Sequence, residues 1–82
     1  ELSNVEFKIF KFMINKKENV LSRKCIFENI YNSKAIGDLN NITVHINNLR
    51  KKIQNSNSNF LTIETIWGFG YRLSFKENRK IS

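Results

Sequence analysis

The sequence predicts a small α+β domain in which three helices precede a β-hairpin. Apolar residues recur at helical spacing in three separate segments, and two runs rich in β-branched and aromatic residues follow them. The chain has 82 residues, room for one compact domain, and its 40% hydrophobic content is too high for a disordered chain. We therefore expect one domain over residues 1–82, ordered over about 2–75, with a frayed tail at 76–82.

The first helix is expected over about residues 4–15. Ser3 and Glu6 have the spacing of a capping box, in which Ser3 caps the helix and Glu6 reaches back to the Ser3 amide. Ile9 and Phe12 widen the apolar surface of this helix, and the seven Phe residues are expected to supply most of the large core volume. The residues at helical spacing that predict its buried face are Phe7, Phe10, Met13 and Ile14.

A short extended piece at Val20 and Leu21 is expected to add an edge strand to a sheet. Ser22 is then in position to cap a second helix over about residues 23–31. The segment 32–40 is polar and has no periodicity, which predicts a loop. The expected inward residues of the second helix are Ile26, Phe27 and Ile30.

The third helix, over about residues 41–54, separates apolar and polar residues onto opposite faces. The apolar stripe consists of Ile42, Ile46, Leu49 and Ile53. The opposite face holds Asn40, Val44, Asn47, Asn48 and Lys51, with His45, Arg50 and Lys52 on its flanks. After a polar turn, runs at 60–66 and 71–75 predict a hairpin, with Gly68 and Gly70 where the turn requires positive φ.

The charge balance indicates a polyanionic partner. The net charge is +7 and the isoelectric point is near 9.9, which favours nucleic acid or an anionic membrane surface. No apolar run is long enough to span a bilayer, so a membrane-spanning role is not expected. Cys25 is the lone cysteine, which excludes an internal disulfide or a cysteine-based metal site and fits a reducing cytosol. We expect no cofactor, no metal and no enzymatic activity, because no nucleophile–base pair or phosphate-binding glycine loop stands out.

The polar face of the third helix has a physical meaning for DNA. An Asn amide can pair bidentately with adenine, and a Val side chain can pack on a thymine methyl group. Basic residues at the flanks of the helix would meet phosphates. The alternative is that these are simply solvated residues on an outer helix face. The expected base-reading residues are Asn40, Val44, Asn47, Asn48 and Lys51.

With these segments in place, the chain resembles the C-terminal winged-helix DNA-binding domain of OmpR/PhoB-type response regulators. The resemblance covers about residues 2–73, with its motifs in the right order and spacing. The matching motifs are Leu2-Ser3 with Glu6-Phe7, Val20-Leu21-Ser22-Arg23, Val44-His45-Ile46, Leu49-Arg50-Lys51-Lys52-Ile53 and Gly68-Phe69-Gly70-Tyr71-Arg72.

The resemblance implies a winged helix-turn-helix that binds double-stranded DNA sequence-specifically, as the effector module of a bacterial two-component response regulator. The helix at 41–54 would lie in the major groove, and the hairpin at 65–72 would be a wing beside the minor groove. Members of this family usually bind direct repeats as head-to-tail dimers and are switched through a receiver domain. The loop at 32–40 matches the segment that can contact RNA polymerase in this family.

Further contacts are expected on this basis. Tyr71 is expected to combine ring burial with a hydroxyl near phosphate, and Trp67 is assigned to packing slightly ahead of a contact with sugar. The expected DNA-backbone contacts are Arg23, Lys24, Thr43, His45, Arg50, Lys52, Thr65, Tyr71 and Arg72, and the wing comprises Trp67, Gly68, Phe69 and Gly70.

The chain also departs from the pattern of the family it resembles. Of the small sheet that usually precedes the first helix, only Glu1 and Leu2 correspond to residues here. Asn40, Asn47, Asn48 and Trp67 stand where members often carry Arg, which removes charge from the expected contact surface. An alternative is therefore a winged-helix protein–protein interaction module with weak, non-specific DNA binding. RNA binding would call for an exposed row of aromatic residues, and none is evident in the sequence.

Overall fold

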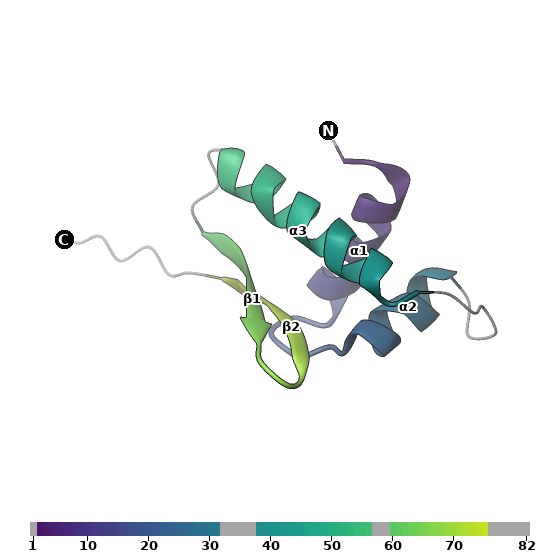
Figure 1. Cartoon of the computed structure of the whole chain (residues 1–82). Helices are drawn as coiled ribbons and strands as arrows, with labels where there is room; N and C mark the ends of the chain where they lie inside the picture. Colours follow the sequence, from purple (N-terminus) through teal and green to yellow (C-terminus); the bar gives the residue numbers. More distant parts are fainter. Residues whose placement is uncertain (1, 32–37, 57–59, 76–82) are drawn as a thin grey trace.

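The structure is a computed structural model that describes residues 2–31, 38–56 and 60–75. Helices α1 (Asn4–Asn15), α2 (Arg23–Tyr31) and α3 (Asn40–Asn55) precede an antiparallel hairpin of β1 (Leu61–Ile66) and β2 (Gly70–Phe75). Figure 1 shows α3 crossing α1, with the hairpin beside α3 and α2 near the N-terminal end of α3. The predicted element order is confirmed, and so is each helix to within one residue at either end.

Two predicted segments fall largely outside this description. The tail at 76–82 lies outside the described residues, and the predicted loop at 32–40 is described only from residue 38. Among the described residues, every helix is too short or too polar to cross a lipid bilayer.

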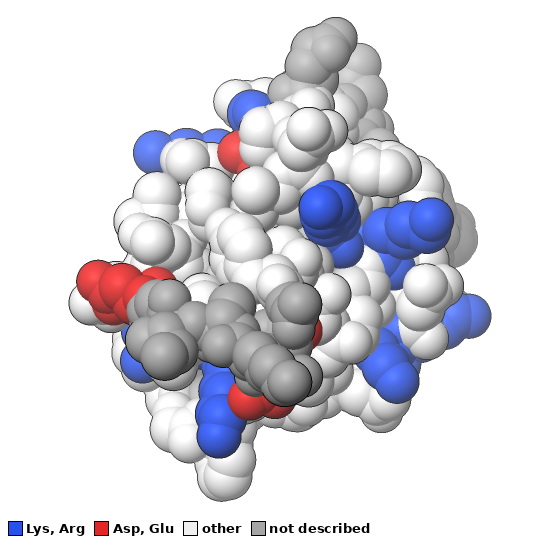
Figure 2. Space-filling view, turned by 90° about the vertical axis from the view of Figure 1, so that its right-hand side faces the viewer, with Lys and Arg blue, Asp and Glu red and all other residues white. Residues whose placement is uncertain are grey.

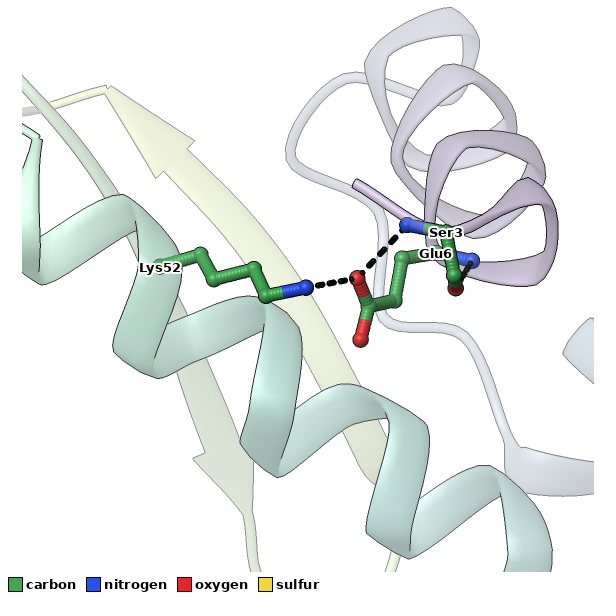
Figure 3. A network of polar contacts seen from close by, with 3 residues as sticks. All are labelled: Ser3, Glu6 and Lys52. Carbon is green, nitrogen blue, oxygen red and sulfur yellow. Dashed lines mark hydrogen bonds and ion pairs between the residues drawn. The ribbon is translucent and has the colours of Figure 1, made fainter. Parts of the chain in front are cut away.

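The predicted capping box at the start of α1 is confirmed. Ser3 Oγ accepts a hydrogen bond from the Glu6 amide at 3.2 Å, and Glu6 Oε1 accepts one from the Ser3 amide at 3.0 Å. Glu6 is buried, only 4% exposed, and its Oε1 also accepts a hydrogen bond from Lys52 Nζ at 2.7 Å. Figure 3 shows how Lys52 reaches from α3 to this carboxylate. The same side chain thus caps α1 and connects it to α3.

The segment between α1 and α2 extends the hairpin by one residue. Leu21 donates its amide to the Tyr71 carbonyl at 2.8 Å and accepts from the Tyr71 amide at 2.9 Å, which forms an isolated antiparallel bridge. The predicted edge strand is therefore the single residue Leu21 on the free edge of β2. Ser22 caps α2 as predicted, because its Oγ accepts a hydrogen bond from the Cys25 amide at 3.0 Å.

The inward face of α1 differs from the prediction. Met13 is buried as expected, but Phe7 is 54% exposed and Ile14 is 38% exposed. The helix packs on α2 and α3 along the line of Glu6, Ile9 and Met13, which is also spaced at three and four residues. This orientation turns Phe7 and Ile14 towards solvent.

The expectation that Phe supplies most of the core volume is wrong. Among the described residues, Phe27 is the only Phe in the buried core. Phe10 and Phe12 are partly buried and pack against this core. Branched aliphatic side chains fill the space where the helices and the hairpin meet. The fully buried side chains are Ile9, Met13, Ile26, Ile42, Ile46, Leu49 and Leu73, and the exposed Phe residues are Phe7, Phe60, Phe69 and Phe75.

Candidate nucleic-acid interface

An open groove of about 770 Å³ runs between the start of α2, the outer side of α3 and the turn of the hairpin. None of the described residues that line it is acidic. Seven of the fourteen residues expected to contact bases or the DNA backbone line this groove, as do the four wing residues, and they come from three separate parts of the sequence. Of the expected base-reading residues only Asn47 lines it, while Asn40, Val44, Asn48 and Lys51 are not among its lining residues. The lining residues are Ser22, Arg23, Lys24, Leu39, Thr43, Asn47, Arg50, Thr65, Ile66, Trp67, Gly68, Phe69, Gly70 and Tyr71.

The predicted division of α3 into two faces is confirmed. Ile42, Ile46 and Leu49 are completely buried against the rest of the fold. On the other side, Val44 is 54% exposed, and Asn40, Asn47, Asn48 and Lys51 are exposed as well. Because the buried stripe fixes the rotation of the helix, the Asn-rich face points outward and is free to meet a partner.

The N-terminal ends of α2 and α3 are joined by Arg23. Its Nη1 donates to Asn40 Oδ1 at 3.2 Å and to Thr43 Oγ1 at 3.3 Å. Asn40 was expected to read a base, but its side-chain oxygen is engaged by Arg23 in the protein alone. The contact places the Arg23 guanidinium at the groove wall, beside Lys24 at the start of α2.

Arg50 joins α3 to the hairpin. Its Nη2 donates to Thr65 Oγ1 at 2.9 Å, and its guanidinium carbon lies 6.0 Å from the centre of the Tyr71 ring. Arg50 was expected to contact the DNA backbone, and among the described residues no carboxylate pairs with it. Its buried Nε atom has no hydrogen-bond partner within the described part of the chain. Tyr71 is 8% exposed, which confirms the expected ring burial.

Other expected phosphate contacts are occupied by carboxylates. Lys52 Nζ lies 2.7 Å from Glu6, outside the groove, and the hydrogen bond from Lys52 is the main reason why the pKa of Glu6 is lowered. Arg72 faces Glu64 across the hairpin and bonds it through Nη2 at 2.6 Å, which lowers the pKa of Glu64. Lys24 lies 3.9 Å from Glu28, and its side chain is 75% exposed, so this pair is loose.

The tip of the hairpin differs from the expected packing. Trp67 is 85% exposed and Phe69 is 72% exposed, so the assignment of Trp67 to packing is wrong. The physical reason is its position in the turn after Ile66, the last residue of β1. A turn that projects beyond the paired strands leaves its side chains without a surface to cover them. The sequence signal for this exposure was the placement of both aromatic residues around Gly68, inside the turn itself.

Positive charge is spread over the face of the molecule that Figure 2 shows. Figure 2, viewed from the right-hand side of Figure 1, shows Lys and Arg in several separate groups and carboxylates at few places. His45 is half-buried on α3. Among the described residues, no group of three or more His, Cys, Asp or Glu side chains is arranged to hold a metal ion.

Comparison with solved structures places this geometry among DNA-binding domains. The DNA-binding domain of CssR from Bacillus subtilis superposes with a TM-score of 0.76 and 29% identity, covering 89% of this chain and 77% of that one. The DNA-binding domain of the response regulator AdeR, solved in complex with an intercistronic region, gives 0.74 and 27%, covering 90% of this chain and 73% of that one.

Curated relatives agree with the structural comparison. The regulatory protein VanR of Enterococcus faecium is 37% identical over 73 residues, which is 88% of this chain and 32% of VanR. The alkaline phosphatase synthesis transcriptional regulatory protein PhoP of Bacillus subtilis is 36% identical over 73 residues, 89% of this chain and 30% of PhoP. The chain thus spans about a third of the length of these relatives.

A family profile covers nearly the whole chain. The family described as "Transcriptional regulatory protein, C terminal" matches residues 1–73, which include α1, α2, α3, β1 and most of β2. The family match, the winged-helix arrangement and the curated relatives all indicate the same family. The chain therefore belongs to this family, the DNA-binding effector domains of OmpR/PhoB-type response regulators.

Proposed function

We propose that this domain binds double-stranded DNA sequence-specifically, with α3 in the major groove and the hairpin beside the adjacent minor groove. The observation that carries the proposal is the groove shared by α2, α3 and the hairpin, which is lined by basic, polar and apolar residues and by no described acidic one. An α-helix fits the major groove of B-DNA, and a cationic groove favours the phosphate backbone.

The exposed face of α3 supplies groups suited to reading bases. Asn47 and Asn48 are exposed, and each amide offers one acceptor and two donors, the set that pairs with the major-groove edge of adenine. Lys51 offers donors to guanine, and Val44 offers an apolar surface for a thymine methyl group. We assign base recognition to these four residues.

Backbone contacts are assigned to the groove walls. Arg23, Lys24 and Thr43 come from the paired ends of α2 and α3, where the amide groups at the start of α2 also favour phosphate. Arg50, Thr65 and Tyr71 lie on the wall between α3 and the hairpin. Lys52 and Arg72 are assigned a smaller part, because both already pair with carboxylates.

Selection from random duplexes, followed by affinity measurements on the selected site, tests the proposal. Asn47→Ala or Asn48→Ala is expected to cost about 1–3 kcal/mol of binding and to relax the preference at one base position. Asn15→Ala is the matched control, since it removes an exposed amide that lies on α1 and not on the outward face of α3. Selection that returns no motif, or an unchanged motif for both Asn variants, would contradict the base-reading assignment.

We further propose that the domain is the effector part of a longer regulator that also has a receiver domain. In this proposal it acts in the cytoplasm, and it acts by binding and not by catalysis. The support is that its curated relatives are about three times as long and are transcriptional regulators. Head-to-tail pairing on direct repeats and a contact with RNA polymerase through residues 32–40 complete this proposal. Footprinting with one and two half-sites tests the pairing.

A protein-interaction role is the second candidate. It is favoured by the exposure of Trp67 and Phe69 and by the pairing of Lys52 and Arg72 with carboxylates, which reduces the charge available to DNA. Equal and weak affinity for all duplexes, with a tight protein partner, would select it over sequence-specific DNA binding.

A further inference from the structure

The hairpin tip is apolar and exposed, although the domain as a whole is basic. Trp67 is 85% exposed and Phe69 is 72% exposed, and the turn between Ile66 and Gly70 contains no charged residue. Large aromatic side chains are costly to leave in water, and two of them together on a small domain mark a contact surface.

The surroundings of the tip indicate the kind of partner. Trp67 and Phe69 line the same groove as Arg23 and Arg50, and no described acidic residue lines it. A partner that covers the aromatic rings while α3 is engaged therefore also faces positive charge. A polyanion with apolar faces would match both the positive charge and the exposed rings. Duplex DNA is such a partner, because its phosphates are anionic and its deoxyribose rings are apolar.

We propose that Trp67 and Phe69 form an apolar clasp on the sugars that line the minor groove. This inference rests on the proposed function and deepens it. Apolar side chains are a recurrent means of binding in the minor groove. The indole N–H adds one donor for the acceptors that the groove presents at A·T pairs. Because neither ring is charged, the clasp contributes to affinity without releasing counterions, so its contribution is independent of salt.

The salt dependence of affinity for the selected duplex separates this contact from an ionic one. Trp67→Ala and Phe69→Ala are each expected to weaken binding about tenfold, in the range of aromatic contacts with nucleic acid, while the log–log slope against salt stays at the wild-type value. Trp67→Arg is expected to steepen that slope by about one unit. Lys24→Ala, at a groove residue assigned to the phosphate backbone, should behave oppositely to Trp67→Ala and make the slope shallower by about one unit.

Phe7→Ala is the matched control, since Phe7 is a 54% exposed aromatic residue on α1 that does not line the groove. It is expected to leave both affinity and slope unchanged. Trp67→Ala with wild-type affinity would overturn the clasp and leave sequence-specific binding by α3 intact. Wild-type protein that binds no duplex preferentially would instead overturn the proposed function.

Trp67 is the only tryptophan in the chain, so its fluorescence reports on this contact directly. Adding the selected duplex is expected to quench and blue-shift its emission, and Asn47→Ala should reduce this change only in proportion to the lost affinity. Unchanged emission at saturating DNA would overturn the clasp. A sharp kink in the duplex that Trp67→Ala abolishes would show insertion between base pairs, and would overturn the contact with sugars.

Discussion

Arg50 on α3 donates a hydrogen bond from Nη2 to Thr65 Oγ1 on β1 at 2.9 Å. This contact joins the helix proposed to enter the major groove to the hairpin proposed to lie beside the minor groove. The centre of the Tyr71 ring lies 6.0 Å from the carbon of the same guanidinium, and Tyr71 pairs with Thr65 across the hairpin, so Arg50 is close to both strands at this point. Arg50 therefore positions the wing relative to α3, in addition to offering charge to DNA.

Thr65→Val tests this positioning role. The substitution keeps the β-branched shape and removes the hydroxyl, which leaves the Arg50 guanidinium without its partner. We expect the free energy of unfolding to fall by about 1.5–3 kcal/mol, the range for hydrogen bonds to charged groups. Affinity for DNA should fall as well, because the wing loses its fixed position. Urea unfolding and binding titrations measure the two effects.

Arg50→Lys completes the test, because it keeps the charge but loses the fork-shaped set of donors. If Arg50 positions the wing through Thr65, the double variant should lose less than the sum of the single losses. Additive losses, with Arg50→Lys binding as tightly as wild type, would show that only the charge of Arg50 matters.

Asn40→Ala is predicted to act through Arg23. Asn40 Oδ1 accepts from Arg23 Nη1 at 3.2 Å, and Thr43 Oγ1 accepts from the same atom at 3.3 Å. Loss of the amide should loosen Arg23 and weaken binding to all duplexes to a similar extent, leaving the selected motif unchanged. A shift at one base position after Asn40→Ala, as expected for Asn47→Ala, would show instead that Asn40 reads that base.

Much of this fold could be predicted because its signals are local. The capping box depends on Ser3 and Glu6, three residues apart, and the two faces of α3 depend on one helical period. The turn glycines are equally local, since Gly68 has φ +85° and Gly70 has φ +150°, as predicted. In each case, the residues that determine the geometry are neighbours in the sequence.

The features that escaped prediction depend on distant packing. Helix α1 has apolar residues on several sides, so only its contacts with α2 and α3 decide that Ile9 faces inward and Phe7 faces outward. Lys52 and Glu6 are 46 residues apart, and neither residue indicates the other in the sequence. The position of Trp67 inside the turn was a sequence signal for its exposure, but how far the turn projects beyond the packed fold is decided by the tertiary structure.

The ion pair of the buried Glu6 with Lys52, whose side chain is 43% exposed, is predicted to make the stability of the fold depend on pH in the acidic range. The hydrogen bond from Lys52, supported by that from the Ser3 amide, lowers the pKa of Glu6 in the folded state. The unfolded state then takes up a proton first as pH falls. The stabilisation is therefore complete above the ordinary carboxyl pKa of 4.5 and is lost as pH falls through the lower pKa of the folded state. Urea unfolding between neutral and acidic pH measures this loss.

Glu6→Gln is the test of that assignment. It keeps an acceptor for the Ser3 amide and removes the charge that Lys52 pairs with, so stability at neutral pH should fall by about 1–3 kcal/mol. The variant should also lose less stability on acidification than wild type. Lys52→Met should also make stability depend less on pH, since it removes the main cause of the lowered pKa of Glu6. Wild-type acid sensitivity in Glu6→Gln would assign the effect to other carboxylates, including Glu64.

Gly70→Ala is predicted to damage the fold far more than Gly68→Ala. A Cβ atom at Gly70 would lie 2.1 Å from the Leu21 carbonyl oxygen, whereas at Gly68 it would meet nothing within 4 Å. Gly68→Ala should therefore cost only the strain of positive φ, about 1–2 kcal/mol. Gly70→Ala must in addition push Leu21 away and break its bridge to Tyr71. If urea unfolding gave equal losses of stability for Gly68→Ala and Gly70→Ala, the backbones of Gly70 and Leu21 would not be held this close.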